Sequence, residues 1–213
     1  MLYLFVIRHG ETSCNVENRH TGWLNYPLTE KGVAQAERAG SYCRNLPFDR
    51  YYCSDIQRTR ETFAHIFGSR EDCKYTHLLR ELNSGECAGK KFTECEELYE
   101  ERYRYARRMM DFSGFGGENM EDLFERARAF LQEMEQLPPE VRSVAAVSHG
   151  LIMRTLYGVI SGVDPLKLPI VIDNCGTIVY QLNDNGKWRL RAWNIQDISS
   201  QTDLINEAFP NRN

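Results

Sequence analysis

Several features that mark other protein classes are missing from this sequence of 213 residues. No apolar run has the length of a membrane-spanning helix, and the run at residues 2–7 is too short for a signal-peptide core and has no basic segment before it. The charge is mixed along the chain and sums to only −4, without a basic stripe or an acidic tail. We therefore expect a cytoplasmic protein that binds neither membranes nor nucleic acids and whose partners are small.

Cysteine and metal-binding motifs are also missing. The seven cysteines form no C-x-x-C pair, and the sequence contains no H-x-x-x-H pair, H-E-x-x-H pair or clustered Asp motif. An odd number of cysteines without such pairs is typical of free thiols in a reducing compartment, which argues against a disulfide frame or a zinc site. There is no internal repeat or linker, so we predict a single domain over residues 1–213.

What the sequence does contain is an alternation of short apolar runs with amphipathic segments. Strands are predicted at 2–7, 50–53, 73–79, 144–147, 177–182 and 187–193, and helices from Thr29 to about 45, after a cap at Ser54-Asp55, and at 93–111, 118–137 and 151–160. Such alternation predicts an α/β sandwich. The charged region at about 90–118 is expected to form a lid-like insertion, and the polar tail 196–213 to be partly disordered and flexible.

Chemically active side chains follow three of the predicted strands. Arg8 and His9 end the first, Arg58 lies just beyond the second, and His149 ends the strand 144–147. Ligands of open α/β sheets lie beyond the carboxyl ends of strands, where we expect Gly10 to let the backbone approach a ligand closely. Arginine pairs bidentately with phosphate, so the convergence of these side chains predicts a phosphate pocket. Free N–H groups of the helix after His149 are expected to form an anion site there.

Phosphoryl transfer at such a pocket needs a nucleophile and a proton donor. Histidine can attack phosphorus, because its ordinary pKa of about 6.5 leaves much of it neutral at pH 7. A carboxyl group in the loop near residue 81 could protonate the leaving oxygen if partial burial raises its pKa. On spacing alone four carboxyl groups compete for this role: Glu11, Glu81, Glu86 and Glu118.

Five ordered patterns carry a resemblance to a known family. They are Arg8-His9-Gly10-Glu11-Thr12 with Asn15, Ser54-Asp55-x-x-Arg58-Thr59-x-x-Thr62, Leu79-Arg80-Glu81 with Gly85-Glu86-x-x-Gly89, Gly117-Glu118, and Val147-Ser148-His149-Gly150. In this order, and over roughly residues 2–182, they resemble the histidine phosphatase superfamily with its phosphoglycerate mutase-like fold. The resemblance implies a three-layer α/β/α sandwich with a mostly parallel mixed sheet.

The resemblance also implies roles for individual residues. His9 would be the nucleophile that forms a phosphohistidine, and Glu81 the proton donor that later activates water. The phosphoryl group would be bound by Arg8, Arg58 and His149, with help from Asn15. Further candidates for substrate contacts are Thr21, Gly22, Gly150 and Glu118. The resemblance implies no metal, and we expect no other cofactor.

Within the family, the sequence favours a phosphatase of small phosphomonoesters. The stretch 15–23 is similar to phosphoglycerate mutases, but the connection 114–119 is short, as in α-ribazole phosphatases and broad-specificity phosphatases. A cofactor-dependent, mutase-type phosphotransferase is the alternative. A catalytically silent phospho-ligand binding module is a third, although simple anion binding needs neither a nucleophile nor an acid. A metal-dependent hydrolase is a fourth. The small phosphorylated metabolite that would be its substrate and the oligomeric state are not predicted.

Overall fold

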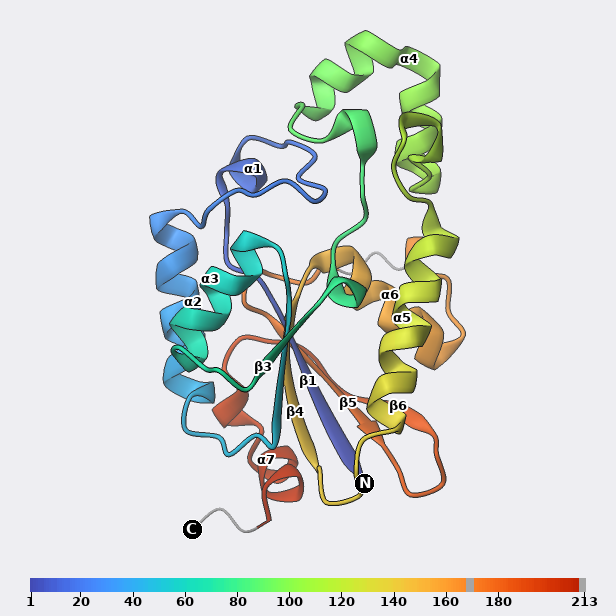
Figure 1. Cartoon of the computed structure of the whole chain (residues 1–213). Coiled ribbons are helices and arrows are strands. Elements are labelled where there is room, and N and C mark those ends of the chain that lie inside the picture. The colour runs from blue at the N-terminus through green and yellow to red at the C-terminus, as the bar shows by residue number, and fades with distance from the viewer. Residues whose placement is uncertain (168–170, 211–213) are drawn as a thin grey trace.

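The computed structural model describes residues 1–167 and 171–210, which fold around one six-stranded sheet (Figure 1). In sheet order the strands are β3 (Cys73–Thr76), β2 (Arg50–Ser54), β4 (Ser143–Ser148), β1 (Leu2–Arg8), β5 (Thr177–Leu182) and β6 (Trp188–Ile195). The first four are parallel to one another, whereas β5 is antiparallel to β1 and β6 to β5. The predicted strand 73–79 is shorter than expected, because residues 77–79 form a 3-10 helix, η1 (His77–Leu79).

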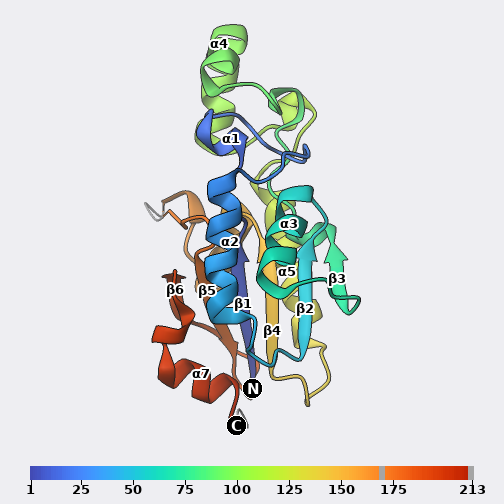
Figure 2. The ribbon, with the colours of Figure 1, turned by 90° about the vertical axis from the view of Figure 1, so that its left-hand side faces the viewer.

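Helices cover both faces of this sheet, as the alternation along β1 requires. Leu4 and Val6 point into a core shared with α5 (Met120–Glu135) and α6 (Gly150–Ser161), whereas Phe5 and Ile7 point into a second core. The second core is shared with α2 (Glu30–Cys43), α3 (Gln57–Phe67) and α7 (Thr202–Ala208). Figures 1 and 2 show the sheet between these two helical layers. The predicted three-layer α/β/α sandwich with a mostly parallel mixed sheet is confirmed.

A further group of elements lies beyond the ends of the strands that carry the site. In both views α1 (Ser13–Val16) and α4 (Phe92–Met109) lie at the end of the molecule opposite the N-terminus (Figures 1 and 2). Two 3-10 helices, η2 (Gly85–Cys87) and η3 (Ser113–Phe115), join the same region. The helix predicted at 93–111 is present but broken, because Glu100 has φ 46° and ψ −122°. Among the described residues, no helix combines the length and apolar character needed to cross a membrane.

The tail differs from the expectation of disorder. Residues 198–200 form a 3-10 helix, η5 (Ile198–Ser200), and α7 follows it. Leu204, Ile205 and Phe209 are buried in the second core. Of the tail that was expected to be partly disordered, residues 196–210 are thus folded onto the second core in the structure, while residues 211–213 lie outside the described part of the chain.

Candidate active site

The site lies where β1 and β4 end side by side. Because the strands are parallel and Arg8 pairs in register with Ser148, the next residues, His9 and His149, become neighbours. Their ring centroids are 5.2 Å apart, and the backbone N–H of His9 donates to the carbonyl of Ser148 at 3.0 Å. The structure thus brings together the two histidines that the strand ends single out.

The ring of His9 is held in one tautomer. Its Nδ1 lies 2.7 Å from the carbonyl oxygen of Gly10, and because a carbonyl can only accept, Nδ1 carries the proton. Burial, together with the charges of Arg58 and Arg8, holds the pKa of His9 well below its ordinary value, so the ring is neutral at pH 7. A neutral ring protonated on Nδ1 keeps its lone pair on Nε2, which is the form of a nucleophile.

Arg58, the second residue of α3, is fully buried beside His149. Its Nε donates to His149 Nδ1 at 3.1 Å, and its two Nη groups donate to the carbonyls of Leu24 at 3.2 Å and Gly22 at 3.0 Å. Burial and the charge of Arg58 hold the pKa of His149 well below its ordinary value, so its single proton is on Nε2, 2.9 Å from Ser54 Oγ. Burial lowers the pKa of Arg58 to about 10, which leaves it charged at pH 7.

Arg8 supplies a second cation at the same place. One Nη group donates to the carbonyl of Ile172, while Nε is buried and has no hydrogen-bond partner within the described residues. Within residues 1–167 and 171–210, neither Arg8 nor Arg58 forms a direct ion pair with a carboxylate. Cations that are shielded from water and make no direct ion pair are costly, so this arrangement favours an anionic ligand.

The carboxylate of Glu81 lies against the N-terminal end of α6. Its Oε2 accepts from the backbone N–H of Leu151 at 3.2 Å and its Oε1 from that of Leu82 at 3.1 Å. The carboxylate therefore occupies an N–H group that we expected to be free for an anion. The charge of Glu81 opposes the lowering of the pKa of both Arg8 and Arg58, which places it close to the two cations.

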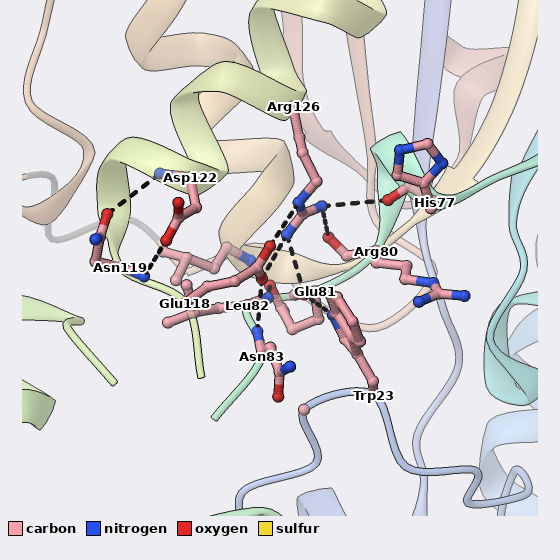
Figure 3. Close-up of polar contacts among 12 residues, drawn as sticks. Trp23, His77, Arg80, Glu81, Leu82, Asn83, Glu118, Asn119, Asp122 and Arg126 are labelled. Atoms are coloured by element: carbon pink, nitrogen blue, oxygen red, sulfur yellow. Dashed lines mark hydrogen bonds and ion pairs between the residues drawn. The ribbon is translucent and has the colours of Figure 1, made fainter. Parts of the chain in front are cut away.

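Arg126 of α5 holds the segment that carries Glu81 (Figure 3). Its guanidinium donates to the carbonyls of Arg80 at 2.7 Å and Glu81 at 3.2 Å, and it pairs with both carboxylate oxygens of Glu118 at 2.9 Å. Glu118 also accepts from the N–H of Asn83 at 2.8 Å. Glu118 is thus engaged by Arg126 and is not among the described residues that line the cavity beside Glu81, so its expected contact with substrate stays a prediction.

That cavity has a volume of about 280 Å³. Thr21 and Gly22 line it together with Glu81, and their contact with a substrate stays a prediction. Gly150 opens α6 next to Arg8, since a Cβ atom on Gly150 would lie 3.5 Å from Arg8 Nε. These three positions therefore lie around the candidate proton donor and one of the two cations.

Asn15 has a local role. Its Oδ1 accepts from the backbone N–H of Thr12 at 3.0 Å in a capping box at the start of α1. Asn15 does not line the 280 Å³ cavity; it is the N3 residue of the capping box of α1, whose N-cap is Thr12.

Two expectations about nearby loops are corrected. Asp55 does not cap α3, whose N-cap is Ile56; its carboxylate pairs with Arg80 at 2.6 Å. Gly10 is small for a packing reason, because a Cβ atom there would lie 2.5 Å from the carbonyl oxygen of Gly32. The close approach that the structure shows at Gly10 is to the backbone of α2.

The structure also adds residues that the sequence analysis missed. Asn174 donates from Nδ2 to the carbonyl of His9 at 2.9 Å, and Trp23 donates from Nε1 to the carbonyl of Glu81 at 2.8 Å. With Arg126, these residues fix the backbone of the candidate nucleophile and acid. The one signal that could have found Trp23 is its place in the stretch 15–23, which resembles mutases.

Two buried, neutral histidines, the buried Arg58 and the partly buried Arg8 lie together beyond the carboxyl ends of parallel strands in an α/β protein, and they form its candidate anion site. The model of the histidine phosphatase superfamily (branch 1) matches residues 4–196, and the chain belongs to this superfamily. Members of the superfamily are phosphatases or mutases, so the protein is an enzyme of that kind.

Relatives and solved structures point to both kinds of member. The chain is 32% identical to "Probable phosphoglycerate mutase GpmB" of Salmonella paratyphi A over 205 residues, covering 92% of each. The α-ribazole phosphatase of Shigella flexneri has the same fold, with a TM-score of 0.83, 21% identity, and coverage of 92% of this chain and 97% of that one. A mycobacterial glucosyl-3-phosphoglycerate phosphatase matches with a TM-score of 0.77, 25% identity, and coverage of 91% and 99%.

Proposed function

We propose that this protein is a phosphatase that hydrolyses small phosphomonoesters through a phosphohistidine intermediate on His9. The observation that carries the proposal is the pair of cations, the partly buried Arg8 and the fully buried Arg58, beside a neutral imidazole and without a direct carboxylate partner in the described residues. Such a site favours a phosphoryl dianion, for which Arg8 Nε offers a donor. Anion binding alone would need the cations but not the nucleophilic form of His9.

The reaction proceeds in two steps. In the first, the Nε2 lone pair of His9 attacks phosphorus, an N–P bond forms, and the P–O bond to the leaving alcohol breaks as Glu81 gives its proton to the leaving oxygen. In the second, Glu81 takes a proton from water, whose oxygen attacks phosphorus while the N–P bond breaks. Arg8 and Arg58 stabilise the charge on the phosphoryl oxygens in both steps, and the proposed reaction uses no metal.

A mutase-type phosphotransferase is the second candidate, because the curated relative at 32% identity carries that name. The two reactions share the phosphohistidine and differ in whether water or a second hydroxyl group receives the phosphoryl group. The solved structure of the mycobacterial glucosyl-3-phosphoglycerate phosphatase, which covers 91% of this chain at 25% identity, favours hydrolysis.

The test is the release of inorganic phosphate from p-nitrophenyl phosphate in excess chelator. We expect the unaltered protein to turn over and His9→Ala to lose activity by a factor of roughly a thousand or more. His65→Ala is the matched control, because His65 lies on α3, is about one-third exposed and makes only a long contact to Glu37 at 3.5 Å. Equal activity of His9→Ala and His65→Ala would refute the role of His9. Activity that chelator removes would contradict the metal-free reaction.

A further inference from the structure

The cavity beside Glu81 is walled mainly by apolar and aromatic side chains. Those that line it are Leu82, Phe92, Met110, Phe112 and Leu151. Because Glu81 also lines the cavity, an alcohol that leaves phosphorus with the help of Glu81 would occupy this space. The side chains that form the walls therefore indicate which kind of alcohol fits the cavity.

His20 belongs to this wall as a neutral aromatic ring. Its centroid lies 4.6 Å from that of Phe92 and 5.2 Å from that of Phe112, and its Nε2 is 2.6 Å from Tyr103 Oη. Burial and the charge of Arg107 lower the pKa of His20 to about 4, so the ring is uncharged at pH 7.

Several of the polar groups that line the cavity are already engaged. Arg19 pairs with Glu17 at 2.6 Å and donates to the carbonyl of Gly89 at 2.9 Å. The carbonyl of Gly22 accepts from Arg58 at 3.0 Å. Ser84 Oγ is buried at the cavity and has no hydrogen-bond partner within the described residues, so it offers a free partner for one hydroxyl group. A leaving group with several hydroxyl groups would still bury some of them without a partner, which weakens binding.

Arg107 extends the aromatic wall at the exposed rim. Its guanidinium lies over the ring of Phe92, with 4.6 Å between Cζ and the ring centroid. Such stacking presents the flat face of the guanidinium, which suits a planar ligand as well as an anionic one.

We propose that the substrate is a phosphomonoester of an apolar, ring-bearing alcohol whose ring occupies the cavity formed by Leu82, Phe92, Met110, Phe112 and Leu151. This inference rests on the proposed function and names its substrate class. A cavity of about 280 Å³ accommodates one such ring with a small substituent. Esters of polyhydroxylated alcohols of similar size are poorer substrates because their hydroxyl groups lose water without gaining partners.

The experiment compares kcat/KM for benzyl phosphate and glycerol 3-phosphate, both esters of primary alcohols. We expect benzyl phosphate to be favoured roughly tenfold or more, the range in which hydrophobic pockets discriminate. Met110→Gln should reduce that preference about tenfold, because it places an amide in the cavity wall. Met109→Gln is the matched control, since Met109 is 43% exposed and does not line the cavity.

Three outcomes would count against the inference. Equal kcat/KM values for the two esters, or a preference for glycerol 3-phosphate, would overturn it while leaving the phosphatase assignment intact. An equal effect of Met110→Gln and Met109→Gln would show that this cavity does not hold the leaving group.

If no ester is hydrolysed, the proposed function fails, and the cavity is then tested by comparing the binding of benzylphosphonate with that of 2,3-dihydroxypropylphosphonate. Tighter binding of benzylphosphonate would support the apolar cavity, and equal binding would overturn the inference as well.

Discussion

Replacing Arg126 by methionine tests how the segment that carries Glu81 is held. Methionine keeps most of the apolar stem and removes the guanidinium. The substitution deletes the two charged hydrogen bonds to Glu118 and the hydrogen bonds to the carbonyls of Arg80 and Glu81. Glu118 is then left with the backbone N–H of Asn83.

The magnitude follows from burial. The side chains of Arg126 and Glu118 are 11% and 15% exposed, so the pair lies closer to a buried ion pair than to a surface one. Removing one partner of a buried pair costs about 3–5 kcal/mol, whereas surface pairs contribute about 0–1 kcal/mol. We expect Arg126→Met to lower the free energy of unfolding by about 3 kcal/mol, and a displaced Glu81 to lower kcat roughly tenfold.

Urea unfolding at pH 7, with kcat for benzyl phosphate, measures both effects. Arg128→Met is the matched control, because Arg128 lies two residues further along α5 and its pair with Glu121 has side chains 54% and 66% exposed. That variant should lose at most about 0.5 kcal/mol. Glu118→Gln combined with Arg126→Met should recover roughly 1 kcal/mol relative to Arg126→Met alone, because no unpaired charge remains. Equal losses in Arg126→Met and Arg128→Met would refute the reasoning.

Three further predictions concern other parts of the fold. His20 has a pKa of about 4 in the folded protein and about 6.5 in the unfolded chain, so protonation favours the unfolded chain as the pH falls below about 6.5. Between pH 6.5 and 4 the free energy of unfolding, measured by urea unfolding, should therefore fall by about 3 kcal/mol more in the unaltered protein than in His20→Phe. Parallel curves for the two proteins would contradict this. Asn174→Ala frees the carbonyl of His9 and should lower kcat for p-nitrophenyl phosphate about tenfold with little change in KM, so a change in KM alone would argue against a positioning role. Gly85→Ala should lower the free energy of unfolding by at least about 2 kcal/mol in the same assay, because Gly85 has φ +53° and an added Cβ would clash with backbone atoms. Gly68 has φ +77° but open space around it, so Gly68→Ala should lower the free energy of unfolding less. Equal losses in the two variants would contradict the clash.

The sequence predicts the centre of the site because its residues are tied to strand ends. His9 and His149 each follow directly on a buried strand, and parallel pairing of these strands brings them together without help from distant loops. Arg58 lies about one helical turn beyond the end of β2, so the position of that strand also predicts where Arg58 lies. The alternation of apolar residues in these strands likewise predicts a sheet with helices on both faces.

Side chains that act across the fold could not be predicted in this way. Arg126 occupies an ordinary position on an amphipathic helix, and its role arises because the side chain reaches carbonyls 45 and 46 residues earlier in the chain. The pairing of Glu118 with Arg126 was missed for the same reason, since Arg126 cannot be recognised as its partner from spacing. The tail was expected to be disordered because its polar residues obscure Leu204, Ile205 and Phe209, which share one buried face.

The central claim is tested most directly by trapping the intermediate. The protein is mixed with benzyl phosphate or p-nitrophenyl phosphate, quenched in base within the first turnover, and digested for mass spectrometry. The account predicts an acid-labile phosphoryl group on His9, absent from His9→Ala and present on Glu81→Gln, in which its hydrolysis should be slowed. Turnover of the ester with no phosphoryl group on His9, or with the phosphoryl group on another residue, would contradict it.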